Sequence, residues 1–283
     1  MIRLSAFADE ISPDLDEQIA VLMSEGISFL DLRSVENTNV LDLSDRQVTQ
    51  LKETLDAQGI GIAAIGSPVG KAPIDSPFEE HWRGFERAIT LAQVFGTPFI
   101  RIFSFYPPAS SAGTVDASAA GLEGWREEVY KRLRAMTARA SEAGVILLHE
   151  NEKDIYGETI ARCVDLLQEC NDAHFQAVID PANFIQCGQT SYPDAYEALL
   201  PWLCYVHVKD ARPDGSVVAA GEGVARWPEL LQRLQLDGYD GFFSLEPHLA
   251  ASGRYSGFSG PDLFRRASQA LQQMLQSMRW EYA

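Results

Sequence analysis

Four apolar segments in the second half of the chain each lead to a side chain that can bind a metal ion. The segments and the residues that follow them are 145–148 with His149 and Glu150, 175–179 with Asp180, 203–206 with His207, and 242–245 with Glu246. Parallel strands that close into a barrel bring their carboxyl ends to one rim, where catalytic residues from several strands meet. Residues far apart in the sequence can therefore share one ion, and the pattern predicts a divalent metal site.

The alternation of short apolar strands with amphipathic helices extends over the whole chain. The expected strands are residues 2–7, 27–32, 60–65, 98–103, 145–150, 175–180, 203–208 and 241–246. Eight strand–helix units with no change in composition predict an α/β fold, a (β/α)₈ TIM barrel forming a single domain over residues 1–283. An open doubly wound sheet is the alternative, but its Gly-x-Gly-x-x-Gly sequence after the first strand is missing.

Charge and hydropathy exclude two classes of partner. The chain has 40 acidic and 23 basic residues, a net charge of −17, and no block rich in Lys or Arg. Because nucleic-acid binding depends on Lys and Arg displacing counterions, we expect no nucleic-acid partner. No apolar run approaches the roughly 18 residues that cross a bilayer, and the start of the chain is too acidic for a signal peptide. We therefore expect an unprocessed cytoplasmic protein that does not bind membranes.

Side-chain alternation selects which residues face the barrel mouth. If Glu150 points inward, its neighbour His149 points toward the helices, because successive side chains of a strand lie on opposite faces. The inward set is then Glu150, Asp180, His207 and Glu246, which offers three carboxylates and one imidazole. These ligands suit one Mn²⁺, Mg²⁺ or Co²⁺ ion, with Zn²⁺ as an alternative. A single acidic strand end is usually a helix cap or an ion-pair member, but four aligned ends favour a metal site.

Four short motifs around these residues resemble a known family. They are His149-Glu150-Asn151, Asp180-Pro181-Ala182-Asn183, His207-Val208-Lys209-Asp210 and Leu245-Glu246-Pro247-His248. They are similar to motifs of the xylose-isomerase-like TIM-barrel superfamily and, within it, of the sugar phosphate isomerase/epimerase family. The resemblance implies that Glu150, Asp180, His207 and Glu246 bind the metal. It also implies that Glu150 and Glu246 are the catalytic acid/base residues.

The resemblance implies a reaction as well. We expect a divalent-metal-dependent isomerase or epimerase of a sugar, sugar phosphate or cyclic polyol, which removes the proton alpha to a carbonyl through a metal-stabilised enediolate. The alternatives are an inosose-dehydratase-like lyase on the same site and a non-catalytic sugar-binding barrel. The expected partner is a small-molecule sugar. The relatives are often dimers or tetramers, so the oligomeric state, a homo-oligomer included, stays open.

Four further residues are candidates for substrate binding. Asn183 stands where many relatives of the family carry His, and an amide can bond a hydroxyl but cannot shuttle protons near neutral pH. Lys209 shares a strand face with His207 and could contact a substrate oxygen, hold Asp180 or form an ion pair at the rim. Arg101 is the lone charge in its strand, which indicates either a substrate contact or an internal ion pair. Arg212 is near the position of a substrate-binding arginine in relatives.

Two other features concern the rim. Asp31 and Arg33 lie two residues apart on one strand face, so we expect them to pair with each other. The connection from Ser104 to about Gly124 is much longer than the usual two to six residues after a barrel strand. It follows the fourth strand, on the same rim as the candidate ligands. It is therefore expected to be either an active-site lid or a surface loop.

Overall fold

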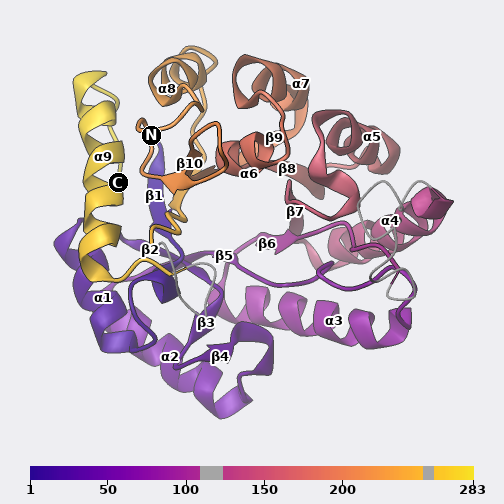
Figure 1. The fold of residues 1–283 in the computed structure, drawn as a ribbon. Helices are drawn as coiled ribbons and strands as arrows, with labels where there is room; N and C mark the ends of the chain where they lie inside the picture. Colours follow the sequence, from indigo (N-terminus) through magenta and orange to yellow (C-terminus); the bar gives the residue numbers. More distant parts are fainter. Residues whose placement is uncertain (109–123, 251–257) are drawn as a thin grey trace.

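A closed barrel of eight parallel strands forms the centre of the computed structural model, which describes residues 1–108, 124–250 and 258–283 (Figure 1). Around the barrel the strands follow the order β1-β12-β9-β8-β7-β6-β5-β2, and β2 pairs with β1 to close it. Their bounds are β1 Arg3–Ala6, β2 Phe29–Leu32, β5 Gly61–Ile65, β6 Phe99–Ile102, β7 Ile146–Glu150, β8 Phe175–Ile179, β9 Leu203–Val208 and β12 Phe242–Leu245. Each lies within the strand expected from the sequence. The predicted TIM barrel is thus confirmed.

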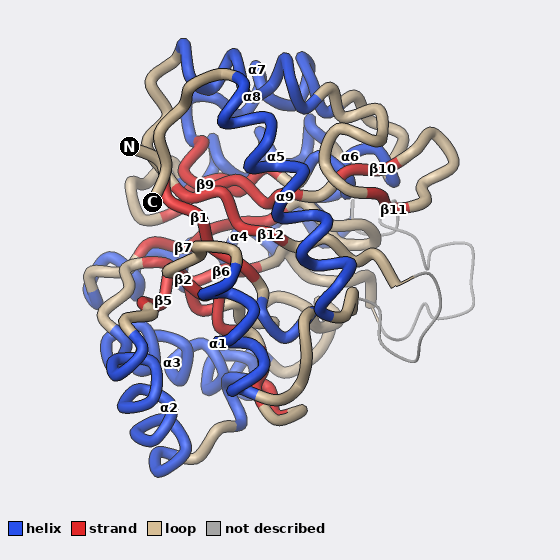
Figure 2. Tube along the Cα trace, turned by 90° about the vertical axis from the view of Figure 1, so that its left-hand side faces the viewer, coloured by secondary structure: helices blue, strands red, loops and turns tan. Residues whose placement is uncertain are grey.

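Helices surround the barrel on its outer side, as both ribbon and tube views show (Figures 1 and 2). The outer helices among the described residues are α1 Leu15–Ser24, α2 Asp45–Gln58, α3 Phe78–Phe95, α4 Arg126–Ala143, α5 Ile160–Cys170, α7 Tyr196–Leu199, α8 Trp227–Leu236 and α9 Pro261–Ser277, whereas the short α6 Pro181–Gln186 lies at the rim. Local sequence explains where several of them begin and end. Ser44 forms a capping box with Gln47 at the start of α2, and Gly59 ends that helix in the left-handed conformation.

Two apolar layers hold the architecture together. The larger one lies between the strands and the helices and contains most of the buried Leu, Ile, Val and Phe side chains. The smaller one fills the inside of the barrel, where Leu148, Val178, Tyr205 and Phe242 meet. A polar group lies beside this inner layer: the buried Asp31 carboxylate accepts hydrogen bonds from Tyr205 at 2.8 Å and from Ser244 at 2.6 Å. Burying a carboxylate among apolar groups is tolerated because these hydroxyls satisfy it.

Three local elements were not expected from the sequence. Two small antiparallel hairpins, Ser34–Val35 with Thr38–Asn39 and Asp210–Ala211 with Val217–Val218, extend the loops that follow β2 and β9. The short helix α6 follows β8 directly. All three lie beyond the carboxyl ends of strands, so they shape the rim. Residues 109–123 of the long connection expected to be a lid lie outside the described part of the chain.

The two ends of the chain meet beside β1 (Figures 1 and 2). The backbone N–H of Leu4 donates to the carbonyl of Ala283 at 2.8 Å, and that of Ala283 donates to Ile2 at 3.1 Å. In the described residues, no helix combines the length and apolarity needed to cross a membrane.

Gly70 is expected to be a position that tolerates no side chain. It lies in the loop after β5 with φ +92°, and an added Cβ would overlap the backbone carbonyl of Phe103. At Gly96, which also has positive φ (+71°), a Cβ would meet nothing within 4 Å. We expect Gly70→Ala to lower the free energy of unfolding by at least about 3 kcal/mol, against about 1 kcal/mol for Gly96→Ala. Urea unfolding at 25 °C measures both, and equal losses would contradict the predicted clash.

Candidate metal centre

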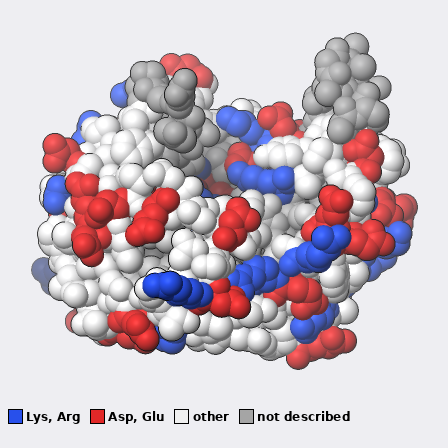
Figure 3. Space-filling model, turned by 90° about the horizontal axis from the view of Figure 1, so that it is seen from below, with Lys and Arg blue, Asp and Glu red and all other residues white. Residues whose placement is uncertain are grey.

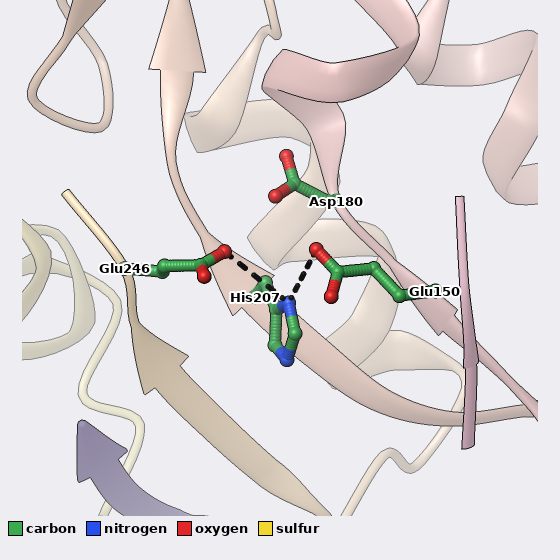
Figure 4. Close-up of side chains that lie close together, drawn as sticks. All are labelled: Glu150, Asp180, His207 and Glu246. Atoms are coloured by element: carbon green, nitrogen blue, oxygen red, sulfur yellow. Dashed lines mark ion pairs between the residues drawn. The ribbon is translucent and has the colours of Figure 1, made fainter. Parts of the chain in front are cut away.

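The four predicted ligands meet at the carboxyl end of the barrel (Figure 4). Glu150 is the last residue of β7, Asp180 follows β8, His207 lies in β9 and Glu246 follows β12. One ligand atom from each side chain can be chosen so that all four lie within 4.8 Å of one another, and all four residues are buried. Parallel strands of a closed barrel therefore bring together residues that are up to 96 positions apart in the sequence (150 to 246).

His207 lies between the two glutamates. Its Nδ1 atom is 3.2 Å from Oε1 of Glu150 and 3.6 Å from Oε2 of Glu246, and the two carboxylates approach it from opposite sides (Figure 4). Asp180 has two roles: its Oδ1 accepts the backbone N–H of Asn183 at 3.0 Å and so caps α6, while its Oδ2 remains directed elsewhere. Capping thus leaves the second oxygen of Asp180 for a positive charge, and the ammonium group of Lys209 lies 2.7 Å from it.

The arrangement fits a small divalent ion. Ligands on opposite sides of a cation bound at about 2.1 Å are about 4.2 Å apart, so the observed cluster needs shifts of only a few tenths of an ångström. His207 Nδ1 and Asp180 Oδ2 are both buried and make no well-aligned hydrogen bond in the part of the chain that the structure describes; their charged neighbours are Glu150 at 3.2 Å and Lys209 at 2.7 Å, respectively. Buried polar atoms without partners are costly unless something else satisfies them. Three carboxylates and one imidazole are the donor set that Mn²⁺, Mg²⁺ or Co²⁺ accepts.

The pKa values of the cluster reflect a demand for positive charge. Burial lowers the pKa of His207, but the surrounding carboxylates, led by Glu150, outweigh burial and raise it. Burial would raise the pKa of Glu246, yet the charges of Lys209 and His248 hold it well below its ordinary value. Asp180 keeps a raised pKa because its burial outweighs the attraction of Lys209. Glu246 is therefore stable as a carboxylate beside positive charge, whereas Asp180 is more readily neutralised by a proton or a cation.

Cationic side chains from other strands surround the glutamates. Nη1 of Arg101, on β6, lies 3.2 Å from Glu150 and 3.4 Å from Glu246, so it bridges the two proposed acid/base residues. Lys209 is 2.7 Å from Oδ2 of Asp180 and 3.3 Å from Oε2 of Glu246. Buried charges of this kind are stable only when paired. The sequence left two options for Arg101 and three for Lys209, and the structure places Arg101 in an internal ion pair and Lys209 against Asp180 and Glu246.

Of the other two candidates for substrate binding, Asn183 lies in the site and Arg212 lies away from it. Asn183 donates from Nδ2 to Glu150 at 3.2 Å and to the backbone of Asn151 at 2.8 Å, and it lines the cavity. Arg212 is exposed in the turn between β10 and β11 and is not among the described residues that line the cavity. The small hairpin, not foreseen in the sequence, carries Arg212 away from the ligands. Its substrate contact remains a prediction without support from the geometry.

Arg33 was the principal residue missed at this site. We expected Arg33 to pair with Asp31, but among the described residues the two side chains have different partners. Asp31 bonds to hydroxyls inside the barrel, whereas Arg33 lies 2.7 Å from Asp9 and 2.9 Å from Glu246. The residues that they contact, Ser244 and Glu246, are themselves two positions apart, so Asp31 and Arg33 share the inward face as expected but find different partners along it. The guanidinium groups of Arg33 and Arg101 both lie over the Phe7 ring, at 4.8 and 4.7 Å from its centroid.

A cavity of about 850 Å³ opens above the cluster. Its lining includes the metal-ligand candidates Glu150 and Glu246, the cations Arg33, Arg101 and Lys209, and outer residues such as Lys71, Tyr106 and Gln186. This volume is ample for a sugar-sized molecule. On the face of the molecule drawn in Figure 3, Lys and Arg side chains are interspersed with Asp and Glu, with no extended basic surface. That distribution agrees with a small-molecule site better than with a nucleic-acid surface.

The chain is a TIM barrel with a buried carboxylate–imidazole cluster at the carboxyl end of its strands, and that cluster is consistent with a divalent metal site. The chain belongs to the xylose isomerase-like TIM barrel family, whose model matches residues 21–277. That family consists mostly of metal-dependent enzymes. No curated protein matches the sequence.

Solved structures share the fold over nearly the whole chain. A D-tagatose 3-epimerase-like protein matches with a TM-score of 0.75 at 16% identity, covering 98% of both chains. The probable 3-DHS dehydratase AsbF of Bacillus anthracis matches with a TM-score of 0.74 at 17% identity, covering 96% of this chain and 99% of its own. A family member from Mycobacterium smegmatis, crystallised with magnesium, matches with a TM-score of 0.69 at 16% identity, covering 98% and 96%. At such identities these likenesses establish the fold alone.

Proposed function

We propose that the protein is a divalent-metal-dependent isomerase or epimerase of a small sugar or cyclic polyol. The observation that carries this proposal is the convergence of Glu150, Asp180, His207 and Glu246 in one buried cluster beneath the cavity. The cluster contains two carboxylates on opposite sides of His207, and we assign one proton transfer to each, because each transfer needs a positioned acid or base (Figure 4).

The chemistry follows from what each side chain can hold. When bound, a divalent cation would supply Lewis acidity toward a substrate carbonyl, worth several kcal/mol of charge stabilisation. One glutamate accepts the proton as the C–H bond alpha to the carbonyl breaks, leaving an enediolate. The other glutamate, protonated from water, delivers a proton to the opposite face or to the adjacent carbon. The first glutamate then returns its proton to water, so the protons balance.

The surrounding cations support this division of labour. Arg101 contacts both Glu150 and Glu246 and so holds the two carboxylates in fixed positions relative to each other. Lys209 holds Asp180 and Glu246 at the opposite edge of the cluster. Positive charges at these distances also favour the negative charge that develops on an enediolate. Arg101, Lys209 and Asn183 are the residues we assign to substrate oxygens, because all three line the cavity.

A dehydratase on the same site is the second candidate. It starts with the same proton abstraction and then needs an acid near the departing hydroxyl. Glu246 lines the cavity, and once it has accepted the alpha proton it can deliver that proton to the departing hydroxyl, so the elimination needs no further acid. The structural likeness to a probable dehydratase is consistent with this candidate. Product analysis by NMR separates the two reactions, since elimination yields an alkene or its keto tautomer and epimerisation does not.

Proton exchange in heavy water tests the proposed function. The Mn²⁺-loaded protein is incubated with D-tagatose, D-fructose, L-ribulose or a keto-inositol, and ¹H NMR follows the signal of the carbon-bound proton alpha to the carbonyl. We expect exchange with at least one member of the panel. At saturating Mn²⁺, Glu246→Gln and Glu150→Gln are expected to slow exchange by about 10²- to 10⁴-fold, the usual contribution of a positioned acid or base.

A matched control separates this effect from a general loss of structure. Glu86 forms an ion pair with Arg139 on the outer helices, 2.8 Å apart, and is remote from the cavity lining. Glu86→Gln should therefore exchange at the wild-type rate. If Glu246→Gln retains the wild-type rate as well, Glu246 is not an acid/base residue. Absence of exchange across the whole panel by the wild-type protein would contradict the proposed function.

A further inference from the structure

We propose that His248 binds a hydroxyl group of the substrate and that Glu10 positions it. This inference rests on the proposed function and adds two residues from another part of the rim. His248 follows Glu246 by two residues, and Glu10 belongs to the short turn Ala8–Glu10 after β1. Neither is among the four residues that form the metal cluster.

Glu10 is a fully buried carboxylate whose two oxygens have different partners. It is 0% exposed. Its Oε2 accepts the backbone N–H of His248 at 2.8 Å and the hydroxyl of Ser259 at 3.0 Å. Its Oε1 lies 3.0 Å from Nε2 of His248, an ion pair with the protonated imidazole that lacks the alignment of a hydrogen bond. Glu10 therefore fixes both the backbone and the imidazole ring of His248, and burial makes these contacts strong because water does not compete for them.

The backbone of His248 is held in an unfavourable conformation. Its φ is +47°, a region that residues other than glycine seldom adopt and that usually costs of order 1 kcal/mol or more. The hydrogen bond from its N–H to Glu10 stabilises that conformation, which turns the ring back over Glu246. Nε2 of His248 is consequently 3.6 Å from Oε1 of Glu246. Such outliers occur most often where a side chain must be aimed at a ligand.

One ring nitrogen of His248 is left for a ligand. The imidazole lines the cavity and its side chain is 25% exposed. Nε2 lies 3.0 Å from Glu10 and 3.6 Å from Glu246, and these contacts with the described residues do not involve Nδ1. An imidazole oriented by a carboxylate through one nitrogen presents the other in a defined direction, as in other sites where a third group orients a base. A hydroxyl of a sugar bound beside Glu246 is the group it can reach.

A second metal ion is the other use of this cluster, because Glu10, Glu246 and His248 also lie within 4.8 Å of one another. The guanidinium of Arg33 argues against it. Nη1 of Arg33 is 2.9 Å from Oε1 of Glu246, and its Nη2 is 3.8 Å from Oε1 of Glu10. A fixed positive charge thus already lies between these two carboxylates. A second cation there would meet strong repulsion at short range.

Two variants test the assignment on the Mn²⁺-loaded full-length protein. His248→Asn removes the imidazole but suits the backbone, since Asn tolerates positive φ better than most residues. Glu10→Gln keeps an acceptor for the His248 N–H and removes the charge that faces the ring. For the panel member with the fastest proton exchange, we expect KM to rise about tenfold in His248→Asn and about threefold in Glu10→Gln, with kcat changed less than threefold. The dissociation constant for Mn²⁺ should stay at the wild-type value.

His174→Asn is the matched control. His174 also lies 3.0 Å from a carboxylate, that of Asp172, but it precedes β8 at the opposite end of the barrel. The His174→Asn variant should have the KM and kcat of the wild type. A wild-type KM in His248→Asn would overturn the assignment while leaving the proposed function intact. Weaker Mn²⁺ binding or a second Mn²⁺ lost in that variant would overturn it in favour of a metal ligand. A wild-type protein that exchanges no panel member would overturn both proposals.

Discussion

Replacing Asp180 with Asn is expected to lower the affinity for Mn²⁺ by more than about 100-fold. Substitution of a residue that merely supports a ligand already costs 10- to 100-fold in metal affinity, and Asp180 is a proposed ligand. The amide oxygen of Asn can still accept the N–H of Asn183, so the cap of α6 is preserved while the second carboxylate oxygen is lost. Titration calorimetry of the metal-free protein with Mn²⁺ measures the change.

Asp165→Asn provides the matched control for Asp180→Asn. Asp165 accepts hydrogen bonds from Arg126 at 2.7 Å and from Tyr156 at 2.8 Å, in contacts that lie outside the cavity lining. Asp165→Asn removes a carboxylate charge that is paired with Arg126 outside the cavity, so this variant should bind Mn²⁺ like the wild type. Equal Mn²⁺ affinity in both variants would mean that Asp180 is only a helix cap and an ion-pair partner.

Replacing Lys209 with Met should cause the largest loss of stability among single substitutions at the rim. Its buried ammonium group lies 2.7 Å from Asp180 and 3.3 Å from Glu246, and Met fills a similar volume without the charge. Removing one partner of a buried ion pair leaves the other uncompensated, which typically costs 3–5 kcal/mol. We expect a decrease of about that size in the free energy of unfolding of the metal-free protein, measured by urea denaturation.

Divalent metal should partly reverse that loss. A cation held by Asp180 and Glu246 compensates the same carboxylates, so saturating Mn²⁺ is expected to raise the melting temperature of Lys209→Met more than that of the wild type. Lys52→Met is the control, because the pair of Lys52 with Asp56 is exposed on α2 and should be worth at most about 1 kcal/mol. If both lysine variants lose stability equally, the ion pairs of Lys209 do not support the site.

Strand ends could be predicted from the sequence because two local signals coincide there. Each of the second-half strands is a run of apolar residues, and the period of two along a strand separates inward from outward side chains. That reasoning correctly placed Glu150, Asp180, His207 and Glu246 in one cluster. The same period does not identify partners: Asp31 and Arg33 share a face, yet they contact Ser244 and Glu246 and not each other.

Contacts made by barrel closure could not be predicted in this way. Glu10 meets His248 and Ser259 because β1 pairs with β12, which joins residues almost 240 positions apart in the chain. No periodicity within a segment reports such a pairing. Arg33 reaches Glu246 across the same seam. Arg212 was wrongly placed near the ligands for a different reason. It lies in the turn of the β10–β11 hairpin, and this hairpin was not predicted from the sequence.

The metal content of the wild-type protein tests the central claim most directly. The protein is stripped with a chelator, incubated with an excess of Mn²⁺, Mg²⁺, Co²⁺ or Zn²⁺ in turn, separated from free ion by gel filtration and measured by elemental analysis. We predict about one tightly bound ion per chain for at least one of these metals, and its loss in Asp180→Asn. A wild-type protein that retains none of the four ions would contradict the account.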